Sequence, residues 1–138
     1  MIKHIGKRMV RNNKVKHIVK ERGYDPRAER HSIVIEYIRE NYDLETVLDI
    51  ASGYGEFLEA CGQEFEGTAK YGLDREKDLL STTEQFVNSH TVQGDAQYLP
   101  FSSNSFDLVT ALGIIEHVAN PTRFVNEVHR VSSDKAVF

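Results

Sequence analysis

From residue 43 onward, short apolar segments alternate with longer amphipathic ones, and this alternation limits the fold more than any other feature of the sequence. The apolar segments have the length and composition of buried strands, and the amphipathic segments have helical spacing. Strands joined through helices pair in parallel, with helices on both faces of the sheet. The sequence therefore predicts an α/β fold, a doubly wound parallel sheet with strands at residues 46–50, 69–73, 91–93, 106–112 and 136–138.

The beginning of the chain differs from the rest in charge. Residues 1–30 carry ten basic and three acidic side chains, whereas the whole chain has a net charge of −4. We expect a basic helical arm over residues 1–24 and one domain over residues 25–138, whose first helix starts at Asp25-Pro26 and runs to about Tyr42. Such an arm is typical of proteins that bind an anionic partner such as nucleic acid, but also of arms that pack on their own acidic domain.

Composition excludes several classes of site. Cys61 is the only cysteine, so neither an intramolecular disulfide nor a multi-cysteine zinc site can form. Histidine pairs such as His4 and His17 lack metal-ligand spacing, and we predict no metal. No apolar run approaches the roughly 18 residues that span a bilayer, and residues 1–11 lack the apolar part of a secretory signal. The expected location is the cytoplasm.

The loop after the first strand is the candidate ligand site, because parallel sheets bind ligands beyond the carboxyl ends of their strands. Gly53 and Gly55 would let the backbone approach a ligand, although a tight turn alone would also use them. The loop is flanked by acids and no bases, and a carboxylate at Glu56 would repel a diphosphate. Leu58 replaces the third glycine of the nicotinamide fingerprint, and no P-loop triplet is present. The loop favours a positively charged nucleoside without phosphate.

S-adenosylmethionine is such a nucleoside, and the chain resembles the class I S-adenosylmethionine-dependent methyltransferases, in their small-molecule (type 11/12-like) branch. Residues 47–58, VLDIASGYGEFL, resemble the first motif of that family, and Asp74 stands where the family has the acid that ends strand two. The segments Gly-Asp-Ala, Leu-Pro-Phe, Phe-Asp-x-Val and Glu-His-Val are similar to later motifs of the branch and occupy residues 94–96, 99–101, 106–109 and 116–118. The resemblance covers about residues 30–138. It implies a Rossmann-like sheet of about five strands in the order 3-2-1-4-5.

The resemblance also implies which residues of the first loop bind the cofactor. Ala51, Ser52, Gly53 and Gly55 would form the loop beneath its methionine and ribose portions. Asp49 would accept hydrogen bonds from this loop or, through water, from the methionine ammonium. The alternative for Asp49 is an acid that only ties down the turn.

The ends of the second and third strands would supply further contacts. Asp74 would accept hydrogen bonds from both ribose hydroxyls, with Arg75 beside it. The alternative role of Asp74 is to cap the next helix, which is compatible with the first. Asp95 would accept the adenine amino group and the Ala96 N–H would donate to the ring, unless Asp95 is a turn acid alone.

Three more candidate residues follow the fourth strand. Leu112 and Gly113 would lie against the nucleoside. His117 is the candidate general base, because it titrates near neutrality and lies close to where the methyl group should point. The alternative is a loop histidine that only bonds the backbone.

The sequence departs from the family pattern in its loops and at its end. Ala51 and Ser52 replace a glycine and a cysteine, and residues 132–135 replace a Pro-Gly-Gly turn. The family's sheet has seven strands, so we expect a C-terminally incomplete domain that self-associates through the edge of residues 136–138 and transfers methyl groups poorly.

The predicted function is methyl transfer to a small-molecule acceptor. The alternatives are a methyltransferase-like module that binds without turnover and a nucleic-acid methyltransferase that uses the basic arm.

Overall fold

The computed structural model describes residues 26–41 and 43–138, and the chain divides into two compact units, Met1–Asp43 and Leu44–Phe138. In the first unit, helix α3 (Pro26–Asn41) begins at the predicted proline, whose φ suits the first helical position. The predicted basic arm, residues 1–24, lies outside the described residues. The arm and the domain limits drawn from it stay predictions.

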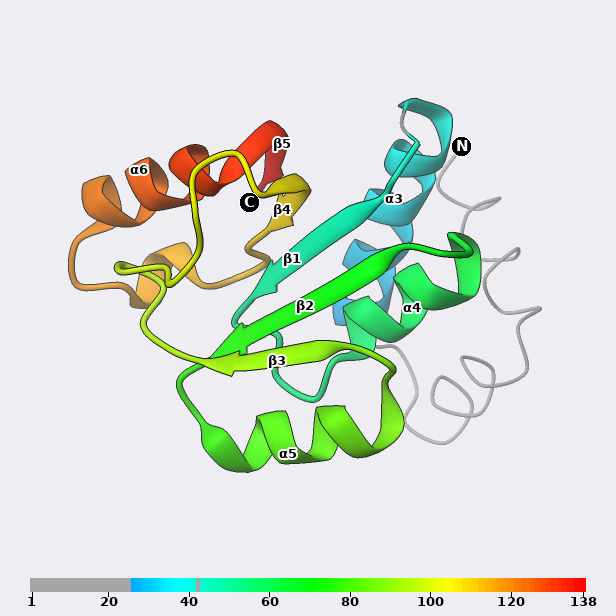
Figure 1. The fold of residues 1–138 in the computed structure, drawn as a ribbon, viewed down its shortest axis with the longest axis horizontal. Helices are drawn as coiled ribbons and strands as arrows, with labels where there is room; N and C mark the ends of the chain where they lie inside the picture. The colour runs from blue at the N-terminus through cyan, green and yellow to red at the C-terminus, as the bar shows by residue number, and fades with distance from the viewer. Residues whose placement is uncertain (1–25, 42) are drawn as a thin grey trace. The chain divides into compact units, whose positions relative to one another are not determined.

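The second unit is a five-stranded parallel sheet in the order β3-β2-β1-β4-β5 (Figure 1). Every neighbouring pair of strands is parallel. The predicted α/β class and strand order are therefore confirmed. The strands are β1 (Thr46–Ile50), β2 (Ala69–Asp74), β3 (His90–Gln93), β4 (Phe106–Thr110) and β5 (Ser132–Val137).

The helices of this unit are α4 (Glu56–Glu64), α5 (Lys77–Phe86) and α6 (Pro121–Val131), with a short 3-10 helix η1 (Ile115–His117). Helix α4 contacts β2, α5 contacts β2 and β3, and α6 contacts β4 and β5. In Figure 1, α5 lies beside β3 and α6 lies beside β4 and β5, at opposite ends of the sheet. The predicted strand–helix alternation is thus confirmed in space.

Side-chain alternation along the strands assigns the helices to the two faces of the sheet. Leu48 and Ile50 of β1 belong to one apolar cluster with Phe124 of α6. A side chain at Gly72 of β2 would point to the opposite face of the sheet, because its Cβ would lie 3.1 Å from a methyl group of Leu58 in α4. The two helices therefore cover opposite faces, as predicted.

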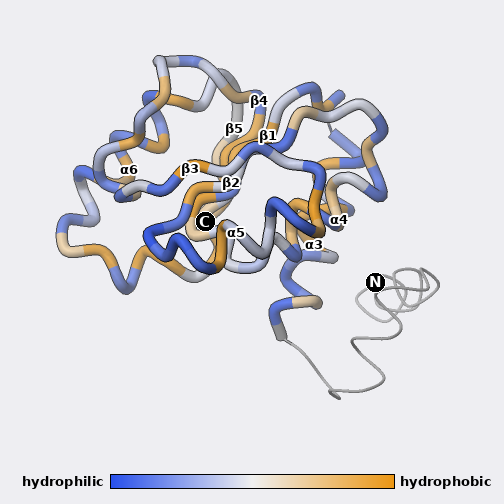
Figure 2. The backbone as a smooth tube through the Cα atoms, turned by 60° about the horizontal axis from the view of Figure 1, so that its bottom comes forward, coloured by the Kyte–Doolittle hydropathy of each residue, from blue (hydrophilic) through white to orange (hydrophobic). Residues whose placement is uncertain are grey.

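The core is densest where the middle of the sheet meets α6. The tube through β1 and β4 is mostly orange, that is apolar, in Figure 2. Phe124, Val128 and Val131 of α6 are buried, whereas Val125 is 38% exposed. Asn120 caps the helix through a hydrogen bond from the Arg123 N–H, and Pro121 occupies its first turn.

Two predicted strand boundaries are wrong. Strand β5 begins at Ser132, so residues 132–135, expected as a turn, belong to the strand; Ser132 pairs with Phe106 and the Ser133 hydroxyl donates to the Phe106 carbonyl. Strand β4 ends at Thr110 and leaves residues 111–112 in the following loop. Within the described residues, no helix is long and apolar enough to cross a membrane.

Candidate functional site

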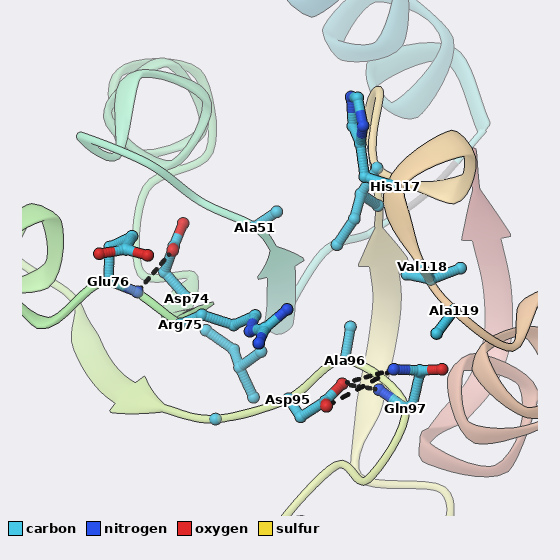
Figure 3. Close-up of a pocket in the computed structure, with 13 residues that line it drawn as sticks. Ala51, Asp74, Arg75, Glu76, Asp95, Ala96, Gln97, His117, Val118 and Ala119 are labelled. Atoms are coloured by element: carbon cyan, nitrogen blue, oxygen red, sulfur yellow. Dashed lines mark hydrogen bonds between the residues drawn. The ribbon is translucent and has the colours of Figure 1, made fainter.

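A pocket of about 270 Å³ lies where β1, β2 and β3 end (Figure 3). Because the strands are parallel, their carboxyl ends meet at one edge, where such sheets bind ligands. The loop around η1, after β4, supplies the opposite side. The lining residues are Ala51, Leu73, Asp74, Arg75, Glu76, Gly94, Asp95, Ala96, Gln97, Ile114, His117, Val118 and Ala119.

One side of the pocket, which we call the acidic wall, consists of Asp74, Glu76 and Asp95. Asp74 is buried at the end of β2, and each of its carboxylate oxygens accepts a hydrogen bond from a backbone N–H group. Oδ2 accepts from the Gly53 N–H at 2.9 Å, and Oδ1 accepts from the Glu76 N–H at 3.0 Å. Helix α5 begins with Glu76 as its N-cap, so Asp74 is not the cap of that helix. Its carboxylate instead connects the loop after β1 to the turn before α5.

Asp95 forms a tight turn with Gln97 at the other end of the acidic wall. Its Oδ1 accepts from the Gln97 backbone N–H at 2.8 Å and from Gln97 Nε2 at 3.2 Å. These hydrogen bonds, and more weakly the charge of Arg75, lower the pKa of Asp95. In Figure 3 the Arg75 side chain extends between Asp74 and Asp95. Asp95 therefore presents carboxylate oxygens that accept hydrogen bonds from hydroxyl and amino groups.

The loop after β1 adopts left-handed backbone angles at Ala51 (φ 58°), Gly53 (φ 56°) and Gly55 (φ 80°). Ala51 lines the pocket. No atom lies within 4 Å of a Cβ built on Gly53, whereas one built on Gly55 would lie 2.7 Å from Thr83 Cγ2 of α5. Gly53 therefore leaves room for a ligand, and Gly55 is required for packing between the loop and α5.

Asp49 lies beneath this loop and does not line the pocket. It is buried, and its Oδ1 accepts a 2.7 Å hydrogen bond from the Thr110 hydroxyl of β4. Burial raises the pKa of Asp49 to about 7; the Thr110 hydrogen bond opposes the rise, and the nearby carboxylates of Glu56 and Asp74 add to it. The side chain thus ties β1 to β4, a role that the sequence did not predict; its hydrogen bonds toward the cofactor ammonium stay a prediction.

Ser52 is also turned away from the pocket. Its backbone N–H donates to the Leu73 carbonyl at 3.1 Å, and its buried hydroxyl has no hydrogen-bond partner. A Cβ on Gly72 would lie 2.8 Å from this hydroxyl. Ser52 therefore acts in packing between the loop and β2.

The opposite side of the pocket, which we call the apolar wall, consists of Ile114, Val118 and Ala119. His117 also lines the pocket, at its outer edge, with 75% of its side chain exposed and its Nε2 3.9 Å from Glu116 Oε1. Figure 3 shows its ring directed away from Asp95 and Gln97.

The sequence predicted six of the thirteen lining residues, and the fold brings these six together: Ala51, Asp74, Arg75, Asp95, Ala96 and His117. The predicted residues Gly53, Gly55, Leu112 and Gly113 are not among the lining residues, whereas Ile114, which follows Gly113, is. The reasoning also missed Gln97, two residues after Asp95, and the whole apolar wall. A rule that the loop after each strand faces the same edge would have found them.

The residues present fit a nucleoside that carries positive charge. Acceptor oxygens at the ends of β2 and β3 suit ribose hydroxyls and a base amino group, and the loop beside Gly53 admits a close approach of the ligand. Among the described residues, no three histidine, cysteine, aspartate or glutamate side chains gather as metal ligands.

Comparison with known proteins agrees with this geometry. Residues 48–138 match the family model described as methyltransferase domain. The chain belongs to this methyltransferase family. A demethylmenaquinone methyltransferase from Geobacillus kaustophilus is 35% identical over an alignment of 95 residues, and the match covers 62% of this chain and 39% of that protein.

Solved structures share the fold of this domain. The YcgJ protein from Bacillus subtilis is 28% identical with a TM-score of 0.66, over 74% of this chain and 45% of that one. An arsenic(III) S-adenosylmethionine methyltransferase from Chlamydomonas reinhardtii shares the fold, with a TM-score of 0.61 and 23% identity, over 66% of this chain and 36% of that one. The chain spans about two fifths of the length of the curated relatives it matches.

Proposed function

We propose that the pocket binds S-adenosylmethionine and that the protein transfers its methyl group to a small-molecule acceptor. The observation that carries the proposal is the convergence of Asp74 and Asp95 on one pocket that Ala51, in the loop after β1, also lines. Family membership supports the reaction class. The demethylmenaquinone methyltransferases among the relatives support a small acceptor.

In this proposal the acidic wall holds the nucleoside. Each Asp74 oxygen accepts one backbone N–H, and a carboxylate oxygen can accept a second hydrogen bond, here from a ribose hydroxyl. Asp95 accepts from the amino group of the base, and the Ala96 N–H donates to its ring. The bound cofactor supplies an activated methyl group on a sulfonium.

The chain's own contribution to transfer is positioning. The apolar wall of Ile114, Val118 and Ala119 excludes water from the side of the pocket that faces the loop after β4. Holding two reactants in line accounts for about 7–11 kcal/mol of a barrier in favourable cases. His117, at the pocket edge, accepts a proton from those acceptors that must lose one.

Binding is the first test. Calorimetry on the 138-residue chain should show binding of S-adenosylmethionine or S-adenosylhomocysteine, with NAD and ATP clearly weaker. Asp74→Ala should weaken binding by about 1.5–3 kcal/mol, the range for a hydrogen bond to a charged group. Asp78→Ala, which removes an exposed acid of α5, is the matched control and should bind like the wild type. Tight NAD binding without S-adenosylmethionine binding would contradict the proposal.

Turnover is the second test. A screen of small-molecule acceptors with radiolabelled cofactor separates an enzyme from a module that only binds. With an acceptor in hand, His117→Ala should lower kcat by about 10²–10⁴-fold, the usual contribution of a general base, and leave cofactor affinity within about twofold. An unchanged kcat would mean that His117 is not the general base.

A further inference from the structure

Gln97 connects two parts of the pocket that belong to different loops. Its side-chain Nε2 donates to Asp95 Oδ1 at 3.2 Å and to Oδ2 at 3.5 Å, on the acidic wall. Its side-chain Oε1 accepts from the Asn120 N–H at 2.7 Å, in the segment that follows the apolar wall. Figure 3 shows the dashed contacts of this side chain with Asp95 at the pocket's edge.

The contact with Asn120 determines which way the Gln97 amide faces. A backbone N–H needs an acceptor, so the amide oxygen must point toward Asn120 and the NH₂ group toward Asp95. Two N–H groups of Gln97 then converge on Asp95 Oδ1, and Oδ2 receives only the long contact. The carboxylate is held in one orientation, with Oδ2 as the oxygen that has acceptor capacity left for a ligand.

We propose that Gln97 is a positioning residue that gives the pocket its preference for a base bearing an amino group. The inference rests on the proposed function, because it assigns a determinant of specificity to the same site. An oriented, ionised carboxylate accepts hydrogen bonds and cannot donate them, so it favours the amino group of adenine over the carbonyl oxygen of hypoxanthine. Without the Gln97 amide group, the carboxylate keeps the backbone hydrogen bond to Oδ1 but can turn about it, so Oδ2 is no longer held in one orientation and much of this preference is lost.

The test compares two ligands that differ at this one group, S-adenosylhomocysteine and S-inosylhomocysteine, by calorimetry on the full chain. The wild type should prefer the adenine ligand by at least about tenfold, the value of one good hydrogen bond to a charged group. In Gln97→Glu the side chain keeps an acceptor for Asn120 but places a second carboxylate against Asp95. The preference should then fall to within about twofold.

Two further variants control for folding and for charge. Gln97→Ala removes the side-chain contacts without adding charge and should reduce the preference as well, which keeps the inference testable if Gln97→Glu fails to fold. Gln63→Glu makes the same change at an exposed position of α4, and this variant should keep the full preference for the adenine ligand.

The outcomes are distinct. If the wild type binds neither ligand, the proposed function is wrong. If the wild type discriminates and both Gln97 variants discriminate equally well, even with weaker binding of both ligands, Gln97 is structural and the inference is overturned.

Discussion

Strands β1 and β4 are joined by an aspartate–threonine pair at each end, and the two pairs differ sharply. At the amino end, Asp107 of β4 accepts hydrogen bonds from the backbone N–H groups of Glu45 and Thr46 and from the Thr46 hydroxyl, at 2.9–3.2 Å. At the carboxyl end, Asp49 of β1 accepts from the Thr110 hydroxyl, is buried, and has a pKa raised to about 7.

The difference shows that features that destabilise the folded state gather at the carboxyl end of these two strands. Beside Asp49 lie the buried Ser52 hydroxyl without a partner and Ala51 with a left-handed backbone. Such features each destabilise the folded state, and they gather at functional sites. The end away from the pocket has a multiply bonded carboxylate instead. The same two strands thus carry a stabilising end and an end that faces the pocket.

Asp49→Asn should give the largest effect, and it should raise stability. A carboxyl group whose folded pKa is about 7 binds more protons in the folded than in the unfolded state between pH 4 and 7, so its ionisation lowers stability as pH rises through that range. Asparagine lacks this ionisation. At pH 8 the variant should be more stable than the wild type by about 2–4 kcal/mol, and near pH 4 the two should converge.

Urea unfolding at pH 4, 6 and 8 measures this effect. Equal stability differences at all three pH values would mean that Asp49 does not titrate in the folded protein within this range.

Asp107→Ala should give the next largest effect, in the opposite direction. It leaves the N–H groups of Glu45 and Thr46 and the Thr46 hydroxyl without their acceptor at the start of β1. We expect a loss of about 2–3 kcal/mol, because these donors lose their hydrogen bonds to a charged acceptor. Asp107→Asn keeps one acceptor oxygen and should lose less in the same urea titration. If the alanine variant is as stable as the wild type, Asp107 does not stabilise the amino end of these strands, and the two ends do not differ as we infer.

Ala51→Gly should give the smallest effect, a gain of about 0.5–1 kcal/mol. The left-handed φ of 58° costs an L-residue about 1–2 kcal/mol, and glycine adopts it freely, although its unfolded state gains entropy. Ala60→Gly, within α4, is the matched control and should destabilise, since glycine is unfavourable in a helix. A thermal melt of both variants measures the sign; destabilisation by Ala51→Gly would show that this loop is not strained.

Much of this architecture follows from the sequence. The strand–helix alternation predicts the sheet, and the acids after the second and third strands predict Asp74 and Asp95 on one side of the pocket. The order of strands and loops places Gln97 and the apolar wall at this edge of the sheet, but it does not predict which of their side chains line the pocket, because that depends on contacts between distant loops, such as the hydrogen bond from the Asn120 N–H to Gln97. Residues 132–135 were expected to form a turn because they stand where the family has a Pro-Gly-Gly turn; without those turn residues, the segment pairs with β4 as a strand instead.

Some residues that carry the family resemblance have structural roles. Arg130 of α6 donates to the carbonyls of Leu99 and Phe101 at 3.0 and 2.7 Å, and Glu127 accepts from the Leu99 N–H at 2.7 Å. The Leu-Pro-Phe segment is thus held on α6, and Asp107 of the Phe-Asp-x-Val segment anchors β1. A motif read from sequence does not reveal which of its residues meet a ligand.

The reactivity of Cys61 can report how often helix α4 separates from the sheet. The thiol is fully buried in α4, burial raises its pKa, and the chain has no other cysteine. Only molecules in which α4 has separated from the sheet can react with an alkylating reagent. The rate of a single mass increase, followed without any introduced label, therefore counts how often this interface comes apart. If an added nucleoside slows this rate, the slowing reports that the nucleoside binds, because α4 directly follows the loop after β1.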